Sequence, residues 1–110
     1  MIDVFTIGRG DTVPELTFEL YPPVNLTGAT VRFTMKRKDA PESEPPVIDR
    51  RVAAKVQDNP GIVRHDWTSG DTATAGSYVA EFEVTFASGK IGTYPNTASK
   101  IGVVVTPSLG

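Results

Sequence analysis

The sequence predicts an all-β fold, an antiparallel β-sandwich or small barrel of about seven or eight short strands. Apolar and polar residues alternate with a period of two along most of the chain, which is typical of strands with one buried and one solvated face. Clusters of Gly, Pro, Asn and Asp separate these segments, as turns do. The chain has 110 residues, 39% hydrophobic and 22% charged, so we expect one globular domain over residues 1–110.

Each expected strand is marked by its own alternation. In the segment 15–20, Leu16, Phe18 and Leu20 point to one face, while two acids and a threonine point to the other. The longest such pattern covers residues 77–86 and predicts the longest strand. Further strands are expected at residues 2–7, 30–36, 61–67, 90–94 and 101–106.

Aromatic side chains on the apolar faces of these strands form the expected core, because they bury the most surface. Residues 87–89, Ala-Ser-Gly, make a short hairpin signal that joins the longest strand to the next one. Three prolines and two acids predict an exposed, extended loop at residues 40–46. The expected core residues are Phe18, Phe33, Trp67, Tyr78, Phe82 and Phe86.

Residues 47–58 fit two interpretations. Ile48, Val52 and Val56 recur every four residues, and the Ala, Lys and Arg content suits a helix. The segment also reads as a strand interrupted by Arg50, and we favour the strand because every neighbouring segment is β. The inward residues of that strand would be Ile48, Val52, Ala54 and Val56.

Composition excludes several classes of site and partner. There is no cysteine, which rules out disulfides, thiolate metal sites and cysteine catalysis. A net charge of −2 with a pI of about 5.3 argues against nucleic-acid binding. No run approaches the roughly 18 apolar residues that a membrane helix needs, so we expect no membrane partner. The first residues lack the basic and apolar regions of a signal peptide.

The residues that could carry catalysis or bind metal have ordinary structural interpretations. Alternation places the sole histidine, His65, on an inward face with Val63 and Trp67, which indicates a core residue. Glu81 and Glu83 share the solvated face of one strand, a common pattern. We therefore predict no enzyme activity, no catalytic residues, no cofactor and no metal site. The scattered carboxylates that could still meet in space are Asp58, Asp66 and Asp71.

The tripeptide Gly-Asp-Thr occurs twice, at residues 10–12 and 70–72, each time before an expected strand. In each copy, we expect the glycine to permit an unusual φ and the Asp side chain to bond backbone amides further along the chain. The first copy also spells Arg-Gly-Asp with Arg9, a motif that adhesion receptors read. Because the second copy has Ser69 there, we interpret Arg9 as incidental. The predicted turn residues are Gly10, Asp11, Gly70 and Asp71.

The stretch GDTATAGSYVAEF resembles the end of an immunoglobulin-type domain, which often carries an acid, a small residue and then Tyr-x-Cys. Ala80 stands where antibody domains have cysteine. The resemblance implies an immunoglobulin-like sandwich in which Tyr78 makes a tyrosine corner, its hydroxyl bonding to backbone a few residues upstream.

A longer resemblance covers almost the whole chain. RGDTVPELTFEL, NLTGATVRFTMKRKD and GIVRHDWTSGDTATAGSYVAEFEVTFASGKIGTYPN stand in the order found in the N-terminal domain of phage baseplate upper proteins. The chain departs from that pattern in the turn at residues 21–24, Tyr-Pro-Pro-Val. The resemblance implies an immunoglobulin-like docking module, without the receptor-binding parts that follow this domain in that family.

From the resemblance we expect a non-enzymatic structural protein of a tailed-phage virion, made in the host cytoplasm. It would attach to tail, baseplate or head, as a docking or decoration module, in several symmetry-related copies. The alternative is a surface adhesion module that binds host glycan or protein. The expected partners are other phage structural proteins, and the contacts would use open edge strands at residues 2–7 and 101–106. The candidate contact residues are Val4, Phe5, Tyr94 and Val104.

Overall fold

A computed structural model describes residues 4–96 and 100–109 of the chain. The described residues form strands and turns and contain no helix that could cross a membrane. The nine strands are β1 (Val4–Gly8), β2 (Leu16–Glu19), β3 (Thr30–Arg37), β4 (Ile48–Val52), β5 (Ala54–Gln57), β6 (Ile62–His65), β7 (Gly76–Thr85), β8 (Ile91–Tyr94) and β9 (Ile101–Thr106).

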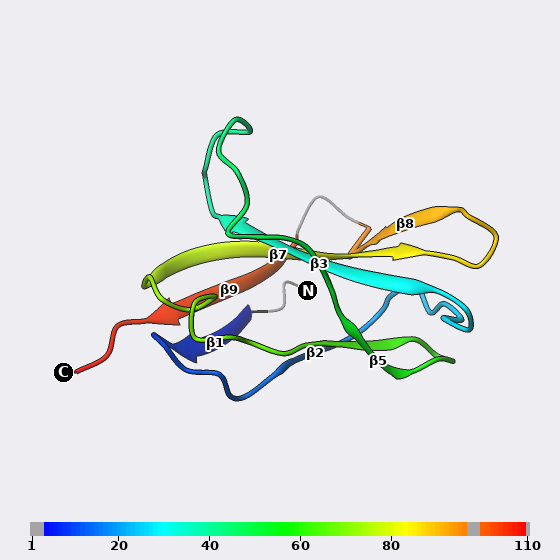
Figure 1. Cartoon of the computed structure of the whole chain (residues 1–110), viewed down its shortest axis with the longest axis horizontal. Helices are drawn as coiled ribbons and strands as arrows, with labels where there is room; N and C mark the ends of the chain where they lie inside the picture. Colours follow the sequence, from blue (N-terminus) through cyan, green and yellow to red (C-terminus); the bar gives the residue numbers. More distant parts are fainter. Residues whose placement is uncertain (1–3, 97–99, 110) are drawn as a thin grey trace.

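The strands form two packed sheets, an immunoglobulin-like β-sandwich as the sequence predicts. The larger sheet has six strands in the order β1-β9-β7-β3-β4, with β8 also paired to β7, and the smaller has the order β2-β6-β5. Figure 1 shows β3 and β7 in the upper layer and β2 and β5 in the lower. Neighbouring strands are antiparallel except β1 and β9, which are parallel.

The side chains that alternate inward along the strands fill the space between the two sheets. Along β3 and β7 every second residue is buried, and the remaining residues face outward. Of the six expected core aromatics, Phe33, Trp67, Tyr78 and Phe82 are buried. Phe18 and Phe86 are only partly buried and pack against the core from its rim, because β2 is an edge strand and Phe86 begins a turn.

Two local motifs lie where the sequence places them. The amide of Gly89 donates to the carbonyl of Phe86 at 2.8 Å, in the hairpin that joins β7 to β8. The hydroxyl of Tyr78 donates to the carbonyl of Thr74 at 2.6 Å, which is the geometry of a tyrosine corner. Both motifs depend on residues close together in sequence, so local patterns suffice to predict them.

Residues 47–58 form strands rather than a helix, but their inward face differs from the predicted one. The segment pairs first with β3 in the large sheet, as β4, and then with β6 in the small sheet, as β5. Its crossing point is Ala53, which is buried, whereas Val52 is 63% exposed and Val56 is 50% exposed. Arg50 has a φ of 51°, and the pairing with β3 shifts register there, so simple alternation fails.

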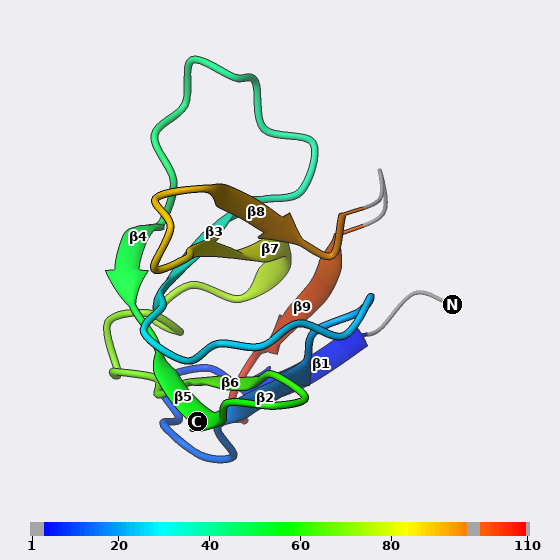
Figure 2. The same ribbon diagram turned by 90° about the vertical axis from the view of Figure 1, so that its right-hand side faces the viewer.

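The sequence predicts an edge strand at Ile101–Thr106, and this prediction is wrong. The strand β9 lies between β1 and β7 and pairs with both, because the chain places its last strand between its first strand and β7. The loop between β3 and β4 stands away from both sheets, as its prolines predict (Figure 2).

Candidate partner-binding groove

The small sheet covers only part of the large one. Two ring contacts show how the sheets face each other. His65 on β6 stacks on Phe33 of β3 with centroids 4.1 Å apart, and Phe18 on β2 stacks on Phe82 of β7 at 6.0 Å. Since β6 lies over β3 and β2 lies over β7, the next position in the small sheet would lie over β9 and β1. No strand of the described residues occupies that position.

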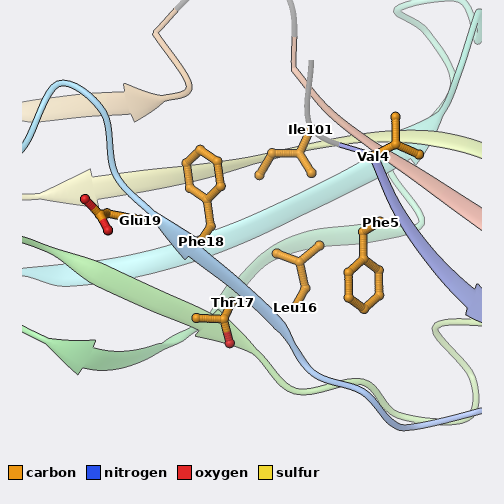
Figure 3. A pocket seen from close by; sticks show the side chains of 7 residues that line it. All are labelled: Val4, Phe5, Leu16, Thr17, Phe18, Glu19 and Ile101. Atoms are coloured by element: carbon orange, nitrogen blue, oxygen red, sulfur yellow. The ribbon is translucent and has the colours of Figure 1, made fainter. Parts of the chain in front are cut away.

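A groove of about 330 Å³ lies at this place. It is shown in Figure 3, with its lining side chains from β1, β2 and the start of β9. Its apolar lining combines an exposed residue (Val4), partly buried phenylalanines and buried side chains that belong to the core. The groove is therefore an opening in the side of the sandwich that leads to the core. Its lining residues are Val4, Phe5, Leu16, Thr17, Phe18, Glu19 and Ile101.

Both strands at the rim of the groove have open edges. The amide of Leu20 donates to Gly61 at 3.0 Å, toward β6, so the backbone groups of Thr17 and Glu19 point the opposite way. On β1, the amide of Arg9 donates to Thr106 of β9 at 2.8 Å, so Thr6 points its backbone groups away from β9. Within the described residues these outward groups meet no other strand.

The opposite side of the sandwich is protected against strand pairing. There the edge is formed by β4 and β5, and both of their pairings contain register shifts. The segment also carries Arg50 at positive φ, with Arg51 and Lys55 nearby. Bulges and basic side chains are devices that keep edge strands from joining other chains. In contrast, β1 has no charged residue and its register is regular over Val4–Gly8.

Of the four contact residues predicted from the sequence, only Val4 is both exposed and part of the groove lining. Val4 is 64% exposed on the edge strand. Phe5 lines the groove but also stacks on Trp67, with centroids 5.7 Å apart. Tyr94 is buried, so it is not a contact residue; β8 turns its side chain into the core. Val104 lies on β9 between two paired strands, so its backbone cannot accept a further strand.

The sequence patterns did not indicate Leu16, Thr17, Phe18, Glu19 or Ile101 as groove residues, although Phe18 was expected in the core. Alternation places Phe18 on the inward face of its strand but does not tell whether another strand follows β2 in the sheet. The one local sign is that Glu15 and Glu19 flank an uncharged stretch.

A second polar cluster lies inside the sandwich, around Asp71. Its carboxylate accepts hydrogen bonds from Arg51 Nη1 at 2.8 and 2.7 Å and from the amide of Thr68 at 2.8 Å, and lies 3.3 Å from His65 Nε2. Burial alone would raise the pKa of Asp71, but the bond from Thr68 and the ion pair with Arg51 outweigh it and hold that pKa below its usual value. Burial lowers the pKa of His65, against the opposing effect of Asp71.

This cluster supports structure rather than chemistry. His65 is 1% exposed and Asp71 is 5% exposed, so a substrate cannot reach them. Among residues 4–96 and 100–109, no group of three or more His, Cys, Asp or Glu side chains could hold a metal ion. Glu81 and Glu83 form ion pairs with Lys100 at 3.3 Å and Arg50 at 2.8 Å.

The two Gly-Asp-Thr segments do not form the same turn. Gly10 has a φ of 80°, whereas Gly70 does not lie in the left-handed region. Asp11 is exposed, and Asp71 is buried and bonds backwards to Thr68 rather than forwards. Instead, the two segments bind each other: the amide of Gly10 donates to the carbonyl of Thr72, and Thr72 Oγ1 donates to the carbonyl of Asp11, both at 2.9 Å.

The Arg-Gly-Asp motif lies in the turn after β1. Arg9 and Asp11 are exposed, and Arg9 Nη2 donates to Ser108 Oγ at 2.8 Å. The structural role of this turn is the contact of its backbone with Thr72, which does not need the Arg9 side chain.

Comparison with known proteins bears on the fold. Neither protein-family models nor curated proteins match the sequence. Among solved structures, the chain is similar to CopC from Methylosinus trichosporium OB3b, with a TM-score of 0.55 and 16% sequence identity. The match covers 98% of this chain and 88% of that one. At this identity the likeness shows a shared β-sandwich fold.

Proposed function

We propose that this chain is a non-enzymatic structural protein of a tailed-phage virion, a docking or decoration module of the tail, baseplate or head. The observation that carries the docking role is the unprotected opening beside β1 and β2, where strand edges and apolar side chains remain uncovered. The phage context rests on the ordered sequence blocks that resemble baseplate upper proteins. Sandwich edges of this kind bind partners by strand addition.

The position of the polar groups supports contact rather than catalysis. The one histidine is enclosed by aromatic rings, with Phe33 on its face and Trp67 edge-on at 4.6 Å. Groups that catalyse a reaction must be reachable by substrate, and His65 is not. Regular, mostly rigid-body contacts between copies of a small domain and a symmetric particle suit a two-sheet sandwich with a packed core.

The alternative adhesion role has less support. Within residues 4–96 and 100–109, Tyr21 is the one aromatic residue that is largely exposed, at 76%. A sugar-binding surface uses exposed aromatic rings, and here the other rings are buried or partly buried.

Mass spectrometry of purified particles tests the proposal. Phage or tail-like particles from a strain that carries the gene are banded on a density gradient, and this chain is quantified against the major structural proteins. We expect it to co-purify in a fixed ratio that survives a second gradient. A chain found only in the soluble lysate refutes the virion role, and specific binding on a glycan array would favour adhesion.

A further inference from the structure

We infer that the groove receives an extended segment of another protein, which adds as a strand beside β2 and completes the small sheet. The segment carries apolar side chains at alternate positions and a Lys or Arg that meets Glu15 and Glu19. This inference rests on the proposed docking function, which it deepens by naming the class of partner.

The small sheet lacks one strand of the usual set. Immunoglobulin sandwiches of the constant type have four strands in the sheet that contains the second strand of the chain, and the first strand lies at its edge. Here that sheet has three strands, because β1 pairs with β9 in the other sheet instead. The position beside β2 is therefore open within the described residues, and it coincides with the groove.

The backbone at this position is ready to pair. Thr17 and Glu19 direct their N–H and C=O groups to the open edge and also line the groove. A strand that pairs with both residues extends the small sheet by one ladder. Every second side chain of such a strand points inward, onto Ile101 and the exposed parts of Phe5 and Phe18. The inward residues must then be apolar.

The acidic residues beside the groove favour a basic residue in the incoming segment. Glu15 and Glu19 are exposed on and just before β2, and neither β1 nor β2 contains a cation. Lys100, next to Ile101, is held by Glu81 at 3.3 Å and by the carbonyl of Pro95 at 3.1 Å. A basic residue in the incoming strand would complement the two acids, while an acidic one would be repelled.

The same charges argue against a second copy as the occupant. If two copies met through their β2 edges, Glu15 and Glu19 would face the same acids across the contact. The β4–β5 edge of another copy is bulged and cannot present a regular ladder. A partner with a basic, alternating strand satisfies both the backbone and the charge.

The inference is tested by selecting peptides that bind the isolated chain from a displayed library of random nonapeptides. We expect the enriched peptides to alternate apolar and polar residues and to contain Lys or Arg. One enriched peptide is then synthesised and its Kd is measured by calorimetry for the natural chain and for variants. Failure to enrich any peptide, or enrichment without alternation or a cation, overturns the inference.

The variants separate strand addition from other contacts. Thr17→Pro removes one outward N–H group and should weaken binding at least tenfold, since the ladder to β6 uses neighbouring residues. The matched control Thr17→Val keeps the N–H group and should bind within about twofold of the natural chain. The double variant Glu15→Gln with Glu19→Gln should bind severalfold more weakly and with less salt dependence. Equal binding by Thr17→Pro contradicts strand addition.

Amide hydrogen exchange covers the case in which Thr17→Pro fails to fold. In the natural chain, the bound peptide should slow exchange at Thr17 and Glu19, and unchanged exchange overturns the inference. A dimer of the chain alone, lost on Thr17→Pro, would assign the groove to a second copy instead. These measurements use the isolated chain and test the groove alone. Absence of the protein from purified particles would refute the virion role and would leave the result for the groove unchanged.

Discussion

The two copies of Gly-Asp-Thr provide a matched pair of substitutions, Asp71→Ala and Asp11→Ala. Asp71 is buried and its carboxylate holds three partners, whereas Asp11 is exposed. The contact between the two turns uses the backbone carbonyl of Asp11, which the substitution keeps. We therefore expect very different losses of stability from the same chemical change.

The loss of unfolding free energy for Asp71→Ala follows from the hydrogen-bond partners that are left without the carboxylate. His65 Nε2 is buried and loses its partner, and an unsatisfied buried group costs about 1–3 kcal/mol. The amide of Thr68 loses its acceptor too, at about 1 kcal/mol, because Thr68 is exposed and water can replace part of the lost bond. The Arg51 side chain is 42% exposed, so its guanidinium regains water and adds little. The sum is about 2–4 kcal/mol, against less than about 0.5 kcal/mol for Asp11→Ala.

Urea unfolding measures this difference. The chain has one tryptophan, Trp67, which is buried beside His65, so its fluorescence reports the loss of the core. The free energies of unfolding of both variants and the natural chain are compared with one common m value, the slope of the free energy against urea concentration. The reasoning is refuted if the two variants lose the same free energy within about 0.5 kcal/mol, since exposure and partners would then not decide the cost.

Three further predictions concern the core. Because burial lowers the pKa of His65, the unfolded state binds a proton more readily as the pH falls below about 6.5, so the free energy of unfolding should decrease from there downward. A second decrease belongs below pH 3.8, where Asp71 is protonated first in the unfolded state; urea titrations at several pH values should show both, and His65→Leu should remove the first. Tyr78→Phe removes the bond to Thr74 and should cost about 0.5–1.5 kcal/mol in the same assay, with no loss speaking against the tyrosine corner. Trp67→Ala should cost about 3–5 kcal/mol by near-ultraviolet circular dichroism melting, and an unchanged transition would show that this ring is not in the core.

The candidate site was only partly predictable. Val4 and Phe5 follow from the idea that the first strand is an edge. Tyr94 was wrong because its side chain is buried, and the edge-strand role expected for Val104 was wrong because β9 pairs on both sides; both outcomes depend on distant strands. The groove arises from the unequal number of strands in the two sheets, and no local pattern records that number.

The sequence by itself determined the all-β class, the inward faces of β3, β6 and β7, the β7–β8 hairpin and the bond made by Tyr78. Each depends on alternation or on turn residues a few positions apart, which short-range geometry controls. Only the tertiary structure decided the splitting of residues 48–57 between two sheets, the inner place of β9 and the opening beside β2. It also separated a buried Asp71 from an exposed Asp11 in identical tripeptides. Strand order and burial come from contacts between residues far apart in the chain, so identical local sequences can reach different environments.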